Sequence, residues 1–118
     1  MGYTRGMLST LLALALSAVP AQADAVFTKK VTEAAQAQTN ERVVYDVRYL
    51  KIAYPGGDVP SGTGVCTDVV IRAYRKAGLD LQVAVHDDMK RNFSVYTKKW
   101  GRRAPDSNIN HRRVPNLM

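Results

Sequence analysis

The stretch from Gly62 to Leu81, GTGVCTDVVIRAYRKAGLDL, decides how this chain folds. It overlaps the end of a loop, residues 55–64, in which two prolines and four glycines prevent a regular element. We predict a helix that begins where this loop ends. Gly78 marks its other end, since glycine is typical of the position just past a helix C-terminus. Cys66, the only cysteine of the chain, falls in the first turn of this helix.

The predicted helix is amphipathic, with Thr63 or Gly64 as its N-terminal cap. The apolar face, which should contact the rest of the protein, comprises Cys66, Val69, Val70, Ala73, Tyr74 and Ala77. The polar face, which should contact solvent, comprises Asp68, Arg72, Arg75 and Lys76. Asp68 and Arg72 stand four residues apart, which is the spacing of an ion pair on one helix face.

Other segments predict a mixture of helix and strand, an α+β fold class. Residues 25–39 and 81–96 have helical periodicity, the second with Val85, Met89, Phe93 and Tyr96 on its apolar face. Residues 42–54 are rich in β-branched and aromatic side chains and indicate a strand or an extended segment. Residues 101–118 have little periodicity and indicate turns.

The N-terminal residues 1–23 have the order of a signal peptide: Arg5, an apolar run from Leu8 to Val19, then the small-residue box Ala21-Gln22-Ala23. The apolar run is about a dozen residues, too short for the roughly 20 of a membrane-spanning helix. A buried N-terminal helix is the alternative. We expect a bacterial periplasmic or secreted protein with no stable membrane span after cleavage.

The chain is basic, with 17 Lys and Arg against 10 Asp and Glu. Without residues 1–23 the balance is 16 against 10, a net charge of +6, which favours anionic partners. If the protein is exported, nucleic acid is not expected as a partner, and cell-wall polymers or anionic lipid head groups are favoured. Solubility explains the positive charge equally well. One Cys and two His exclude a Cys/His zinc site, and no metal or cofactor site is visible. The sequence does not fix the oligomeric state.

A thiol in the first turn of a helix experiences the positive end of the helix dipole and free N–H groups, and both favour the thiolate. The thiolate is the nucleophile in covalent catalysis. The N–H groups of Cys66 and Thr67 are candidate donors to an oxyanion. The alternative is an inert core cysteine.

The segment YPGGDVPSGTGVCTDVVIRAYRKAGLDL resembles the active-site segment of the NlpC-type papain-like cysteine peptidases. Departures from that pattern are Thr67 and Asp68, where Ser and Gly are usual, and one extra residue between the Gly-Gly turn and Cys66. The matching residues are Tyr54, Gly56, Gly57, Pro60, Ser61, Gly62, Cys66, Thr67, Val70, Tyr74, Gly78, Leu79 and Leu81.

A closer resemblance is to exported bacterial proteins grouped as domain of unknown function 1287. It rests on the blocks IAYPGGDVP, GVCTDVVIRAYR, VHDDM and PDSNINHRRVPNL, and covers roughly residues 40–118. The papain-like relationship implies a helical half carrying Cys66, packed on an antiparallel sheet. It also implies hydrolysis of amide bonds in peptidoglycan peptides.

The resemblance further implies that such proteins continue past the HRRVPNL block into a Gly-Asp strand and a His that acts as the base. This sequence is therefore expected to be a fragment or truncated product, residues 24–118, without most of the sheet and without that His. For His111 an anion-contacting or structural role is favoured. It is retained as a weaker candidate base, because the cations Arg112 and Arg113 should lower its pKa. His86 is expected to be a surface residue.

Substrate contacts are assigned to Tyr54, Asp58, Thr67 and Asp68, with ordinary packing or ion pairing as the alternative for each. The main hypothesis is a periplasmic cysteine amidase or endopeptidase that acts on peptidoglycan, with Cys66 as nucleophile. A non-enzymatic domain that binds the cell envelope and an inactive truncated product are the alternatives.

Overall fold

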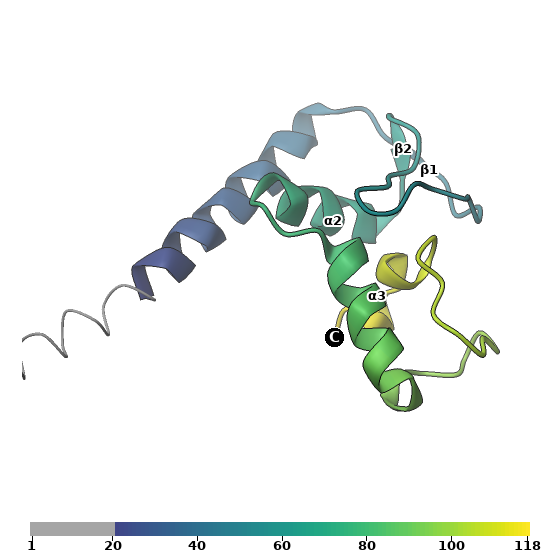
Figure 1. The fold of residues 1–118 in the computed structure, drawn as a ribbon. Coiled ribbons are helices and arrows are strands. Elements are labelled where there is room, and N and C mark those ends of the chain that lie inside the picture. Colours follow the sequence, from purple (N-terminus) through teal and green to yellow (C-terminus); the bar gives the residue numbers. More distant parts are fainter. Residues whose placement is uncertain (1–20) are drawn as a thin grey trace, which may run out of the picture.

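A computed structural model describes residues 21–118 (Figure 1). The predicted signal peptide lies outside the described residues, apart from residues 21–23, which are helical. A first helix spans residues 21–37. The remaining elements are η1 (Gln38–Asn40), β1 (Val44–Tyr45), β2 (Thr63–Gly64), α2 (Cys66–Lys76), α3 (Leu81–Asn92), η2 (Phe93–Val95), η3 (Asn110–Arg112) and η4 (Val114–Asn116), where η marks a 3-10 helix.

The bounds of α2 agree with the predicted helix, and its caps explain them. The Asp68 carboxylate accepts a hydrogen bond of 2.7 Å from the N–H of Val65, which is the N-cap in place of the predicted Thr63 or Gly64. At the other end Gly78 has a φ of +101°, and the Leu79 N–H donates to the Tyr74 carbonyl at 3.0 Å. This six-to-one bond defines a Schellman ending, as Gly78 predicts.

The predicted faces of α2 are wrong in the first half of the helix, whereas Ala73 is buried and Lys76 is exposed as predicted. Asp68 and Thr67 are buried together with Ile71, whereas Cys66, Val69 and Val70 are exposed. The reason is that Asp68 has a buried cationic partner, Arg112, 44 residues away in sequence. Helical periodicity alone predicts that every charged side chain of the helix is exposed to solvent, because it takes no account of a partner so distant in sequence.

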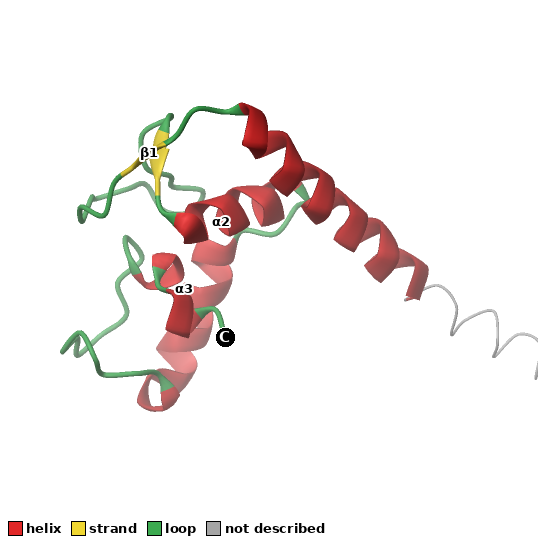
Figure 2. Ribbon diagram, turned by 180° about the vertical axis from the view of Figure 1, so that it is seen from behind, coloured by secondary structure: helices red, strands yellow, loops and turns green. Residues whose placement is uncertain are grey.

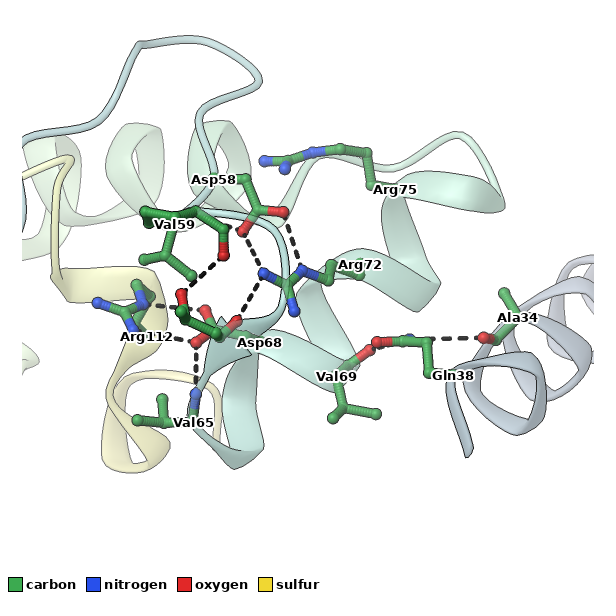
Figure 3. A network of polar contacts seen from close by, with 12 residues as sticks. Ala34, Gln38, Asp58, Val59, Val65, Asp68, Val69, Arg72, Arg75 and Arg112 are labelled. Atoms are coloured by element: carbon green, nitrogen blue, oxygen red, sulfur yellow. Dashed lines mark hydrogen bonds and ion pairs between the residues drawn. The ribbon is translucent and has the colours of Figure 1, made fainter. Parts of the chain in front are cut away.

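The predicted ion pair between Asp68 and Arg72 is also wrong. Arg72 instead binds the carboxylate of Asp58, with its Nε 2.9 Å from Oδ2, and donates to the Thr63 carbonyl. Figure 3 shows the guanidinium of Arg72 turned toward Asp58 and that of Arg112 turned toward Asp68. Arg72 therefore ties α2 to the loop that precedes it.

The buried ion pair joins α2 to η3. The two Asp68 oxygens accept hydrogen bonds of 2.9 and 3.0 Å from Arg112, and both side chains are only 3% exposed. The Thr67 hydroxyl donates to the Arg112 carbonyl at 2.8 Å. One residue of η3 therefore holds two consecutive residues of the first turn of α2.

α3 is held by the fully buried side chain of Gln82. Its amide nitrogen donates to the carbonyls of Ala53 and Ser107, and its oxygen accepts the N–H of Gly57 at 2.9 Å. A Cβ on Gly57 would lie 1.9 Å from the Ala53 carbonyl oxygen, so the turn accepts only glycine there. Gln82 therefore connects three segments that are distant in sequence.

The predicted apolar face of α3 is confirmed for Val85 and Met89, which are buried. The helix ends at Asn92, earlier than predicted, and the half-buried Phe93 begins the 3-10 turn η2. The first helix contacts α2. Its Phe27 ring packs edge-on against Tyr74, with centroids 5.7 Å apart.

Strand content is small, as Figure 2 shows. Within residues 21–118 the only sheet pairs β1 with β2 in parallel, Val44 opposite Thr63 and Tyr45 opposite Gly64. Most of the predicted strand, residues 42–54, is extended or turn, and β2 lies at the end of the predicted loop. The described chain is thus a small, mainly helical fold with a little sheet, of the α+β kind. None of its helices has the length and apolarity that crossing a bilayer requires.

Replacing Arg112 by Met should lower the free energy of unfolding by about 3–5 kcal/mol, because it leaves the Asp68 charge buried without a partner. Arg48→Met is the matched control. Arg48 also binds a carboxylate, that of Asp46, but it is 74% exposed and solvent screens the pair. Chemical denaturation followed by circular dichroism measures both variants. Equal, small losses in the two variants would show that the buried pair does not hold the fold together.

Candidate functional site

Cys66 is the first residue of α2, and it is exposed. It borders a cavity of about 260 Å³ between β1, the start of α2 and the C-terminal 3-10 turns. The cavity is lined by Tyr45, Val47, Val65, Cys66, Thr67, Ile109, Arg112 and Val114. Because the faces are reversed in the first half of α2, the thiol lies at the surface rather than in the core.

Two backbone donors lie beside the thiol. The first N–H groups of a helix have no acceptor within it, and no other group in residues 21–118 accepts a hydrogen bond from the N–H of Cys66 or Thr67. Free N–H groups next to a nucleophile can stabilise negative charge on a substrate oxygen. The site therefore combines an accessible thiol, two unused donors and a cavity.

The side chains of Thr67 and Asp68 hold the first turn of α2 in place beside the cavity. The Thr67 hydroxyl is already used on the Arg112 carbonyl, and the Asp68 carboxylate is used on Arg112 and on the Val65 N–H. The side chains of these two predicted substrate-binding residues are therefore occupied in fixing the first turn of α2.

His111, the candidate base, is buried and only 2% exposed. Burial, followed by the charges of Arg112 and Arg75, lowers its pKa from 6.5 to about 4. Its ring is therefore neutral near pH 7, as a base must be, and its Nδ1 has no hydrogen-bond partner in the described part of the chain. His111 does not line the cavity beside Cys66, however, and no hydrogen bond joins the two residues.

The other predicted site residues lie elsewhere. Tyr54 packs edge-on against His86, with ring centroids 5.0 Å apart, and His86 lines a separate cleft with Tyr49 and residues 102–108. Asp58 binds Arg72 and lines a third cleft, between the first helix and α2. Of the predicted set, only Cys66 and Thr67 line the same cavity.

Sequence reasoning missed Arg112 and Gln82 as organising residues. Arg112 stands in a segment without periodicity, and Gln82 stands in a helix where a polar residue predicts exposure. The motif PDSNINHRR gives one indication of such a role. So many polar residues in a turn-rich segment indicate side chains that form hydrogen bonds with the backbone. No three His, Cys, Asp or Glu side chains between residues 21 and 118 are grouped so as to hold a metal ion.

Residues 32–118 match the profile of a family described as "Domain of unknown function (DUF1287)". The chain is similar to "Uncharacterized protein YijF" of Escherichia coli strain K12, with 53% identity over 87 residues. That match covers 74% of this chain and 42% of the relative, so the chain spans about two fifths of the length of the curated relative that it matches. No solved structure matches the chain.

Burial of His111 predicts a pH-dependent stability. Its folded pKa of about 4 lies below the unfolded value of 6.5, so the unfolded state takes up a proton first. Stability is then complete above pH 6.5 and falls as the pH drops toward 4, by about 3 kcal/mol at most. Denaturant midpoints at pH 7, 5.5 and 4.5 measure the slope.

His111→Leu should flatten the slope between pH 6.5 and 4, because leucine does not titrate. Carboxyl groups change the stability at lower pH than His111 does. For Asp88, hydrogen bonds from Tyr96 and Asn92 hold the pKa below its usual 3.8, so its contribution is lost only from about that pH downward. An unchanged slope in His111→Leu would assign the effect to other groups.

Proposed function

This chain belongs to the family described as "Domain of unknown function (DUF1287)", and on that premise we propose that it carries the nucleophile of a cysteine amidase or endopeptidase. The observation that supports the proposal is the placement of Cys66, exposed at the first position of α2 and beside a cavity. A papain-like fold, with the described residues as its helical part, belongs to the same proposal.

The proposed reaction has two steps. The Cys66 sulfur attacks an amide carbonyl carbon, the C–N bond breaks, and the amine leaves with one proton, which produces a thioester. Water then attacks the thioester, giving a carboxylic acid and the free thiol. In each step the N–H groups of Cys66 and Thr67 stabilise the oxyanion.

Amide cleavage also requires a group that accepts and donates protons. Neither histidine in the described residues borders the cavity of Cys66. We therefore propose that the base comes from a segment that corresponds to the part of the longer relative outside the 87 matched residues. On this proposal the described region supplies the nucleophile and the oxyanion donors.

The proposed substrates are peptides of bacterial peptidoglycan, reached by export through the predicted signal peptide. The net charge of +6 after residue 23 supports an anionic polymer as the target, because opposite charge raises the local concentration and the rate of encounter.

An activated ester such as p-nitrophenyl acetate tests the nucleophile without requiring the base, since p-nitrophenolate leaves without a proton. We expect a burst of one p-nitrophenolate per chain at pH 7.5, followed by slow turnover. Intact mass should show one acetyl group on Cys66. Cys66→Ser should show no burst.

Iodoacetamide provides the control for accessibility. Because the chain has one cysteine, its alkylation rate reports on Cys66 alone, and the rate in guanidinium chloride gives the unfolded reference. We expect the folded protein to react at pH 7 about as fast as this unfolded reference, because the thiol is exposed. Slower alkylation in the folded state, or alkylation without an acetyl burst, would argue against the nucleophile.

A further inference from the structure

We propose that the cavity beside Cys66 binds one uncharged, apolar side chain of an extended peptide, and that this peptide lies along the free edge of β1. The inference rests on the proposed function and specifies the substrate of that site. It follows from three features: the charge balance of the cavity, its size and the direction of the hydrogen bonds of β1.

The lining of the cavity has no uncompensated charge. Five of the eight lining residues have uncharged aliphatic or aromatic side chains: Tyr45, Val47, Val65, Ile109 and Val114. Its one charged side chain, that of Arg112, is held by both oxygens of Asp68 in a pair that is 3% exposed. A charged side chain that entered this cavity would lose water and find no counter-charge.

The size of the cavity fits a single side chain. Its volume of about 260 Å³ lies below the roughly 300–1,000 Å³ of pockets that enclose a whole drug-sized ligand. The rest of a longer substrate must therefore lie outside it, on the neighbouring surface.

That surface is the edge of β1 on which no other strand of residues 21–118 lies, here called its free edge. The N–H groups of Val44 and Asp46 donate to the Gly62 and Gly64 carbonyls at 2.8 and 3.0 Å. Successive residues of a strand direct their backbone groups to opposite edges, so Tyr45, the last residue of β1, presents its groups on the other side. Val47 lies two residues past the end of β1. The side chains of both residues line the cavity, and both residues are 70% exposed.

A bound peptide can therefore form backbone hydrogen bonds and bury a side chain at the same place. An extended peptide that pairs with Tyr45 gains main-chain hydrogen bonds. Its side chain enters a cavity that contains Cys66, so a carbonyl of the same peptide lies near the thiol.

The test uses peptide chloromethyl ketones, in which the sulfur of Cys66 displaces chloride and forms a C–S bond. Three peptides differ only in the residue next to the reactive group, which is Leu, Lys or Asp, and a fourth is the Leu peptide with N-methylated backbone amides. Labelling is followed by intact mass and divided by the iodoacetamide rate of the same protein.

We expect the Leu peptide to label at least about tenfold faster than the Lys and Asp peptides, and N-methylation to slow it severalfold. Val47→Asp should remove the preference for Leu over Lys. Val44→Asp is the matched control: it lies in the same segment, is 63% exposed and does not line the cavity, so it should keep the preference.

The outcomes separate the inference from the proposed function. Equal labelling by all peptides overturns the inference and leaves Cys66 as a nucleophile. No labelling by any peptide, with normal alkylation by iodoacetamide, contradicts both. A dimer in light scattering that Val47→Asp dissociates would show that a second copy occupies the edge, and would also overturn the inference.

Discussion

The buried ion pair between Asp68 and Arg112 is the interaction on which the rest of the structure depends. Asp68 uses its two oxygens on the guanidinium and also accepts the Val65 N–H that begins α2. Burying two charges is costly unless their hydrogen bonds are satisfied, and here η3 satisfies them. The start of α2, and with it the position of Cys66, is therefore set by a segment 44 residues further along the chain.

The interior of this small fold relies on polar contacts to an unusual degree. The buried hydrophobic residues of the described chain are Val59, Ile71, Ala73, Val85 and Met89, fewer than its buried polar and charged residues. Apolar burial is not directional, whereas hydrogen bonds fix geometry. Gln82, with its three backbone partners, and Arg112 thus determine how the helices and loops meet.

The positions of the helices could be predicted from the sequence better than which of their faces are buried. Local signals were sufficient for Gly78 at the end of α2 and for Val85 and Met89 in α3, because caps and periodicity act within a few residues. The orientation of α2 depends on Arg112, which no window around Asp68 contains. For the same reason Cys66 was placed at the correct end of the helix but on the face predicted to contact the rest of the protein. The burial of His111 also depends on contacts distant in sequence, which composition does not reveal.

The adjacent glycines of the Tyr54–Gly57 turn carry different evolutionary constraints. Gly56 has a φ of +71° and open space where a side chain would stand, a conformation that asparagine also adopts. Gly57 has no such space, since a Cβ would meet the Ala53 carbonyl. As sequences of this family diverge, position 56 can drift to asparagine while position 57 cannot vary without rebuilding the loop that Gln82 holds.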